Sequence, residues 1–300
     1  MVSVEKKSLF GKRHMPTEFD VGSVQHMFVS GNYLAYWTLG EGEPLVFVHG
    51  WPFHSATYHA LVPYFMRHYC CILVDSPGLG LTEWSEDTNF AFPGQARTFE
   101  TFLERLGLKQ YSIIAHNTGA TIARLLASEN RRVKRLIILN TEIPGERPPW
   151  FPLYARMMRL PGSRLTFRLL LRSQKFLKSP MGFGECYADS ARINEQFIER
   201  YVRPLVDDPL RLEGVIRYLS IGLDFHLIDS LRRYHLRIRA PVHFIWGKAD
   251  PTFPIDGARR MMHHFRYCTG LTEIERGKLL AHEEFPEQVA YAALKFLRSS

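Results

Sequence analysis

The fold is decided by one short run, Ile113-Ile114-Ala115-His116-Asn117-Thr118-Gly119-Ala120. Its apolar, β-branched start predicts a strand, and a helical pattern follows it. The residues two before and two after Asn117 are small, which allows the strand and the helix to approach closely across a tight turn. The sequence therefore predicts a strand, a strained turn centred on Asn117, and a helix.

Short apolar runs recur on both sides of this turn and alternate with segments of period near 3.6. These runs are 45–48, 71–74, 113–115, 136–139 and 242–245. Strands that are apolar on both faces and alternate with helices form a mostly parallel sheet covered on both sides. Two earlier runs, 23–30 and 33–39, are separated by Gly31-Asn32 and predict an antiparallel hairpin. The expected fold class is therefore α/β.

One interval breaks the alternation of strands and helices. From residue 143 to residue 239 the chain is rich in Pro and Arg and has helical character, without a strand-like run. We interpret it as a helical cap inserted between two parts of an α/β core, 1–142 and 240–300. An insertion there would lie above the C-terminal ends of the strands, where open α/β sheets bind their ligands.

Four further motifs accompany the tight turn in a fixed order. They are His49-Gly50-Trp51-Pro52, Asp75-Ser76-Pro77-Gly78-Leu79-Gly80, Trp246-Gly247-Lys248-Ala249-Asp250-Pro251 and Leu279-Leu280-Ala281-His282-Glu283-Glu284. With the turn as a nucleophile elbow, this set resembles the α/β-hydrolase fold family, whose order is nucleophile, acid, histidine. The resemblance spans residues 25 to 297 and implies a mostly parallel sheet flanked by helices, with an inserted helical cap.

Within that family the motifs resemble the branch with an aspartate nucleophile, which includes epoxide hydrolases and haloalkane dehalogenases. The resemblance implies that residue 117 attacks carbon and that His282, oriented by Asp250, activates the water that hydrolyses the ester. It also implies that N–H groups near Trp51 and Thr118 hold the oxyanion. Glu142 is an alternative acid, because some dehalogenases carry theirs after the corresponding strand.

Two residues depart from the pattern of that branch. Asn117 stands where the branch has aspartate, and a neutral carboxamide is a poor nucleophile. Thr118 stands where dehalogenases place a tryptophan that holds the departing halide, leaving Trp51 as one such donor. An epoxide hydrolase would instead need tyrosine O–H groups from the cap, for which Tyr154, Tyr201 and Tyr218 are available.

Three hypotheses about function follow. In the first, Asn117 replaces a natural aspartate and silences a hydrolase of small apolar epoxides or haloalkanes. In the second, Asn117 is natural and deamidates slowly to aspartate. In the third, the protein is a pseudoenzyme that binds a ligand without turning it over. The retained Asp250 and His282 favour the first two.

The composition narrows the classes of partner. No metal or cofactor is expected, since the four cysteines have no metal-ligand spacing. The net charge of +8 is concentrated in the middle of the chain, yet no nucleic-acid motif accompanies it. A solvated basic helix face is the favoured interpretation, and contact with a membrane surface is the alternative. We expect a cytoplasmic protein, and the oligomeric state is open.

Overall fold

The computed structural model describes residues 24–299 and has one eight-stranded sheet in the order β1-β2-β4-β3-β5-β6-β7-β8. The strands are β1 (Gln25–Val29), β2 (Asn32–Leu39), β3 (Glu43–Val48), β4 (Tyr69–Val74), β5 (Tyr111–Ala115), β6 (Val133–Leu139), β7 (Val242–Gly247) and β8 (Cys268–Ile274). The β1–β2 and β2–β4 pairs are antiparallel and the others are parallel. The predicted α/β class and the antiparallel start are confirmed.

The first hairpin turn lies one residue earlier than predicted. Its central residues are Ser30 and Gly31, with φ of 48° and 80°, whereas Asn32 is already the first residue of β2. Two successive positive φ values suit the right-handed twist of a two-residue hairpin. Asn32 closes the turn differently, because its side-chain amide donates to the carbonyl oxygens of Val29 and Ser30.

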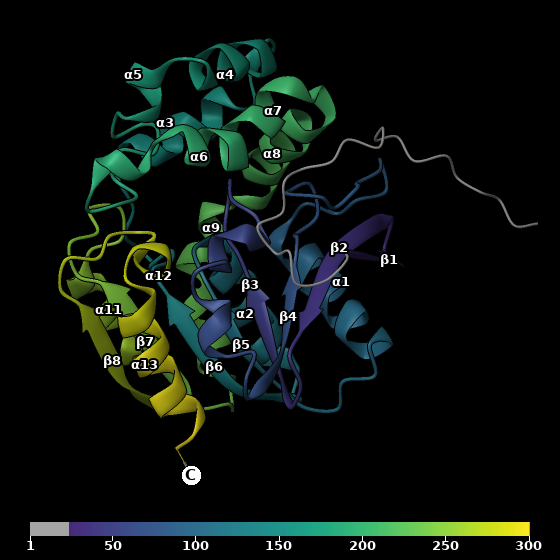
Figure 1. The fold of residues 1–300 in the computed structure, drawn as a ribbon, viewed down its shortest axis with the longest axis vertical. Helices are drawn as coiled ribbons and strands as arrows, with labels where there is room; N and C mark the ends of the chain where they lie inside the picture. The colour runs from purple at the N-terminus through teal and green to yellow at the C-terminus, as the bar shows by residue number, and fades with distance from the viewer. Residues whose placement is uncertain (1–23, 300) are drawn as a thin grey trace, which may run out of the picture.

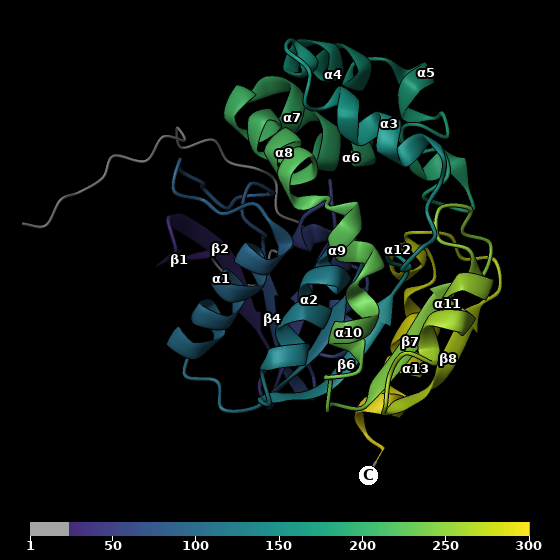
Figure 2. The ribbon, with the colours of Figure 1, turned by 180° about the vertical axis from the view of Figure 1, so that it is seen from behind.

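Helices cover both faces of the sheet, as Figures 1 and 2 show from opposite sides. The helices α1 (Phe92–Arg105), α2 (Thr118–Glu129) and α11 (Ile255–Met262) bury apolar side chains in one core cluster. The other face is covered by α13 (Pro286–Leu297) and by the short 3₁₀ helices η1 (Ser55–Tyr58) and η2 (Val62–Tyr64). A short helix, α12 (Ala281–Glu284), precedes α13.

A group of helices lies beyond the C-terminal ends of the parallel strands (Figure 1). We call residues 150–222 the cap. It contains α3 (Trp150–Met157), α4 (Ser163–Leu171), α5 (Gln174–Leu177), η3 (Ser190–Arg192), α6 (Glu195–Phe197), η4 (Ile198–Val202), α7 (Arg203–Asp207) and α8 (Pro209–Gly222). None of the helices in residues 24–299 is long and apolar enough to cross a bilayer.

Two helices of the expected insertion lie beside the core rather than among the cap helices. They are α9 (Phe225–Asp229) and α10 (Leu231–His235), and α10 packs against α2 (Figure 2). The domain boundaries at 142/143 and 239/240 stay a prediction. The chain returns to the core layer near Leu223, before β7 begins.

Strand β8 has no counterpart among the predicted runs. It is the edge strand of the sheet, and its residues Thr269, Gly270, Thr272 and Glu273 interrupt the apolar pattern. An edge strand has one unpaired side and needs fewer apolar residues than an inner strand. Apolar runs alone therefore do not reveal it.

Candidate active site

Asn117 lies at a strained turn between β5 and α2, as the sequence predicts. Its φ of 51° and ψ of −136° are unusual for a residue other than glycine. A Cβ at Gly119 would lie 2.2 Å from the carbonyl oxygen of His49, and one at Gly50 would lie 2.3 Å from the Cβ of Asn117. The small residues are therefore required by the close approach of two loops around residue 117.

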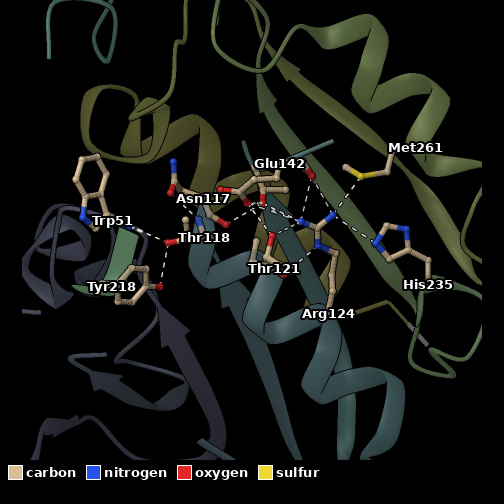
Figure 3. A network of polar contacts seen from close by, with 11 residues as sticks. Trp51, Asn117, Thr118, Thr121, Arg124, Glu142, Tyr218, His235 and Met261 are labelled. Carbon is tan, nitrogen blue, oxygen red and sulfur yellow. Dashed lines mark hydrogen bonds and ion pairs between the residues drawn. The ribbon is translucent and has the colours of Figure 1, made fainter. Parts of the chain in front are cut away.

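The two backbone N–H groups expected to hold an oxyanion are both engaged by protein atoms. The N–H of Thr118 donates to Oδ1 of Asn117 at 2.6 Å, and the N–H of Trp51 donates to Oγ1 of Thr118 at 2.9 Å. The hydroxyl of Tyr218 lies 3.0 Å from that same Thr118 oxygen (Figure 3). A ligand oxygen could use these donors only by displacing the two side chains.

The indole of Trp51 is directed toward the cap. Its N–H donates to the carbonyl oxygen of Val215, in α8, at 2.9 Å. The same ring stacks on Phe167 of α4 with the centroids 6.4 Å apart. The one halide donor that the sequence offered at Trp51 is thus occupied by a backbone carbonyl.

His282, in α12, is buried and contacts a threonine. Its Nε2 lies 2.8 Å from Oγ1 of Thr57, and that hydroxyl donates to Oε1 of Glu283 at 2.6 Å. Because the single hydroxyl proton of Thr57 goes to the carboxylate, the imidazole Nε2 carries a proton and Nδ1 does not. Burial lowers the pKa of His282 well below its usual range, so the ring is neutral.

Glu283 links the cap to the core. Besides Thr57, its carboxylate accepts the phenol O–H of Tyr187 at 2.5 Å and that of Tyr201 at 2.6 Å, both from the cap. Tyr201, one of the three tyrosines considered as donors to a substrate, is thus directed to Glu283. A buried carboxylate with three hydroxyl donors is well satisfied.

Asp250 follows β7 and is held by two donors other than His282. Asn140 Nδ2 donates to Oδ2 at 2.7 Å, and the N–H of Thr252 donates to Oδ1 at 2.8 Å. Within residues 24–299, no hydrogen bond joins Asp250 to His282, although the family resemblance implies one. Burial raises the pKa of Asp250 to about 7.

This raised pKa gives an expected dependence of stability on pH. Between pH ~4 and ~7 the folded state keeps the Asp250 proton while the unfolded state, with the ordinary pKa of 3.8, has lost it. The free energy of unfolding should therefore fall by roughly 2–4 kcal/mol as the pH rises through this window. Chemical denaturation at several pH values should show that Asp250→Asn removes this slope, whereas Asp256→Asn, at an exposed position, keeps it. Equal slopes in the wild-type chain and Asp250→Asn would contradict the assignment.

Glu142, the alternative acid, belongs to a different buried network (Figure 3). Its Oε2 accepts from Thr121 Oγ1 at 2.7 Å and lies 3.9 Å from Nη2 of Arg124. Burial lowers the pKa of Arg124 to about 10, while Glu142 opposes this shift, so the guanidinium stays charged at neutral pH. Within the described part of the chain, no hydrogen bond or ion pair joins Glu142 to His282.

A cavity of about 80 Å³ lies between the cap and Asn117. Its wall is mostly apolar and aromatic, including Phe53, Phe151, Tyr154, Phe167 and Phe183. The polar groups at its wall include Asn117, Thr118 and Glu142, whereas Asp250 and His282 do not line it. Of the predicted residues, 51, 117, 118, 142 and 154 line the cavity, whereas 201, 218, 250 and 282 do not.

The comparisons with known proteins agree with this architecture. A family model described as the alpha/beta hydrolase fold matches residues 43–276. This chain belongs to the α/β-hydrolase fold family. The predicted family is confirmed, and the mostly parallel eight-stranded sheet flanked by helices is that of an α/β hydrolase.

Three similar proteins illustrate the range of this α/β-hydrolase family. A pimeloyl-[acyl-carrier protein] methyl ester esterase of Legionella pneumophila (strain Lens) is 35% identical over 72% of this chain and 79% of its own. A cis-3-alkyl-4-alkyloxetan-2-one decarboxylase of Shewanella oneidensis is 34% identical over 40% of each chain. The solved structure of the epoxide hydrolase CorEH has a TM-score of 0.76 at 21% identity, covering 92% of this chain and 98% of that one.

The coverage of these relatives differs. This α/β hydrolase spans 40% of the length of the decarboxylase and less than half of two further curated relatives. Likeness to CorEH at 21% identity shows the fold alone. The comparisons therefore establish membership of the α/β-hydrolase family, but they do not identify the substrate.

Several residues of the site escaped the sequence analysis. Thr57, Tyr187 and Asn140 lie in no motif, and nothing in the sequence marks them. Glu283 directly follows His282, and Arg124 lies within the apolar run of α2 at 0% exposure. Arg124 was the one residue that the sequence could have indicated, because a charged residue in an otherwise apolar helix needs a buried partner.

Proposed function

We propose that this α/β hydrolase opens the epoxide ring of small, largely apolar molecules, and that Asn117 disables or severely slows its first step. The observation that carries the proposal is the position of two cap tyrosines. Tyr154 lines the cavity together with Asn117, and the Tyr218 hydroxyl lies 3.0 Å from Thr118 Oγ1. Burial raises the pKa of both phenols, so each keeps its proton at neutral pH.

The proposed chemistry uses those protons. With a carboxylate at position 117, one oxygen attacks a ring carbon, the C–O bond of the epoxide breaks, and the ring oxygen takes a proton from a tyrosine. His282 then accepts a proton from water at its unprotonated Nδ1 as the water attacks the ester carbonyl. The ester C–O bond breaks, the diol leaves, the carboxylate is restored, and the proton on the imidazole passes to the tyrosine that lost one. The N–H groups of Trp51 and Thr118 would hold the oxyanion after their present partners move.

A haloalkane fits the site less well. The indole N–H of Trp51 already donates to Val215, and Thr118 offers no second indole. A halide leaving group needs donors that stabilise a negative ion, whereas an epoxide oxygen needs a proton. The tyrosines supply the second requirement, which supports the epoxide over the carbon–halogen substrate.

The relatives support a strained oxygen ring as the substrate class. A soluble epoxide hydrolase of Corynebacterium sp. is 33% identical over 39% of this chain, and the Shewanella decarboxylase is named for an alkyl-substituted four-membered oxygen ring. The Legionella relative acts on a methyl ester, so esters belong in any substrate panel. The apolar wall of the cavity suits the alkyl portion of each of these molecules.

The tyrosine assignment can be tested in the Asn117→Asp background. Tyr154→Phe and Tyr218→Phe should each lower kcat/KM for an epoxide such as styrene oxide by about 10²-fold, because the ring oxygen loses its proton donor. Hydrolysis of an aryl ester, whose leaving group needs no such donor, should change much less. Tyr291→Phe, at an exposed position on α13, is the matched control. Equal losses on both substrates would contradict a donor role.

A second candidate function rests on a different observation. Both oxyanion donors are occupied by Asn117 and Thr118, and the carboxamide of residue 117 is a poor nucleophile. These contacts favour a pseudoenzyme that binds an apolar ligand in the cavity without turnover. Complete inactivity of Asn117→Asp, together with measurable ligand binding, would favour this alternative.

A further inference from the structure

The outer side of the first cap helices has an excess of positive charge. Residues 147 to 184 contain eight Lys or Arg and no Asp or Glu. Arg147 and Arg164 pair with acids elsewhere, at Asp229 and Glu213. Four exposed basic residues of this stretch have neither an ion pair nor a side-chain hydrogen bond within residues 24–299. They are Arg156, Arg172, Lys175 and Lys178.

Large apolar side chains protrude among these charges. Leu153, Leu160, Leu165, Leu169 and Met181 are 41–63% exposed. On α4, Leu165 and Leu169 lie one turn apart, and Arg164, Arg168 and Arg172 follow the same spacing beside them. The opposite side of α4 buries Phe167 and Leu171 against the cavity. Helix α4 therefore has an apolar and basic outer face as well as its buried inner face.

We propose that this outer face, residues 153–181, docks the protein peripherally onto an anionic lipid surface. Such a surface offers phosphate groups to unpaired Arg and Lys side chains, and acyl chains to the leucines between them. The exposed leucines are unfavourable for a purely solvated face, and a membrane would bury them while it pairs the basic side chains with phosphate groups. The sequence alone favoured a solvated face, and it did not show that the leucines point outward.

The connection to the cavity favours lipid over an acidic protein partner. Met181, 41% exposed, belongs both to this outer face and to the cavity wall, and the exposed Pro180 lies beside it. The cavity thus reaches the surface at the proposed contact. An apolar molecule dissolved in a bilayer would enter at this point without crossing water.

Vesicle sedimentation with the full chain tests the proposal. Vesicles of phosphatidylcholine alone are compared with vesicles in which about a third of that lipid is phosphatidylglycerol. The charge variant changes Arg156, Arg172, Lys175 and Lys178 to Gln, and the leucine variant changes Leu165 and Leu169 to Gln. Circular dichroism verifies that each variant is folded.

Two control variants change residues of the core, outside the cap. One changes Arg131, Arg237, Arg239 and Arg266 to Gln, and these residues line a groove near the start of β6. It removes as many positive charges as the charge variant. The other changes Leu236 and Tyr291, 58% and 73% exposed, to Gln. Neither control touches the cap.

The wild-type chain should bind the anionic vesicles and not the neutral ones. The charge variant should bind at least ~50-fold more weakly, since each basic residue near an anionic surface contributes about fivefold. The leucine variant should lose about tenfold or more, and both controls should bind as the wild type does. Absent binding, or equal loss in the controls, would overturn the proposal. Full binding by the leucine variant would also overturn it, because charge attraction alone would then explain the binding. A wild-type dimer that only the leucine variant dissociates would overturn it too, because the leucines would then form a contact between two copies of the chain.

Discussion

Asn117→Asp should raise epoxide hydrolysis by roughly 10³-fold or more, because it converts a neutral carboxamide into a charged nucleophile of the same size. The substitution needs no repacking, since the new carboxylate can accept the same N–H of Thr118 that Oδ1 accepts now. Initial rates on a panel of epoxides, haloalkanes and aryl esters, measured beside the unchanged chain, give the result. The substrate class with the largest gain names the function.

The matched control is Asn194→Asp, at the N-terminus of α6, where aspartate caps a helix as well as asparagine. Intact-protein mass should be recorded for fresh and stored samples of the unchanged chain. Conversion of residue 117 to aspartate on storage, with activity rising in parallel, would support natural deamidation. Turnover by the unchanged chain without any change in its mass would exclude deamidation. If the Asn117→Asp variant is inactive on every substrate class, the pseudoenzyme hypothesis is favoured.

The second large effect concerns His282. In the Asn117→Asp background, His282→Gln should lower kcat by about 10⁴-fold, while the first attack on the epoxide still takes place. The ester would then form without being hydrolysed, because no base activates water. Mass spectrometry should detect a protein heavier by the mass of the whole epoxide, with the modification on the peptide that contains residue 117.

His68→Gln is the control for this experiment. His68 is exposed and directly precedes β4, outside the site. It should turn over the epoxide at nearly the rate of its parent and accumulate no adduct. Loss of activity in His282→Gln without any adduct would mean that His282 acts before or during the first step, which would contradict its role in hydrolysing the ester.

The fold could be predicted because local requirements and global arrangement agree. The turn at Asn117 requires small neighbouring residues, and apolar runs that alternate with helices form a parallel sheet. Both features can therefore be recognised from the sequence alone. Strand β8 was missed because an edge strand with Thr, Gly and Glu lacks the apolar run. The hairpin turn was placed one residue late because Asn32 closes it with its side chain.

The site could be predicted only in part. Sequence order indicated which residues gather at the ends of the strands, and Asn117, Thr118, Glu142 and Tyr154 do meet at one cavity. It could not indicate hydrogen-bond partners, which depend on side-chain rotamers and on segments distant in the chain. Thr57 is separated from His282 by 225 residues, yet it takes the position next to Nε2.

The carboxylate of Glu283 has a thermodynamic consequence. It holds the phenols of Tyr187 and Tyr201 and, through Thr57, the proton on Nε2 of His282. Lifting the cap would remove two of its three hydroxyl donors and so change how strongly the carboxylate accepts from Thr57. Cap position and imidazole tautomer are therefore coupled equilibria, and coupling between equilibria is reciprocal. A ligand that stabilises the closed cap also stabilises one protonation pattern of the ring, and a change at the ring alters how readily the cap opens.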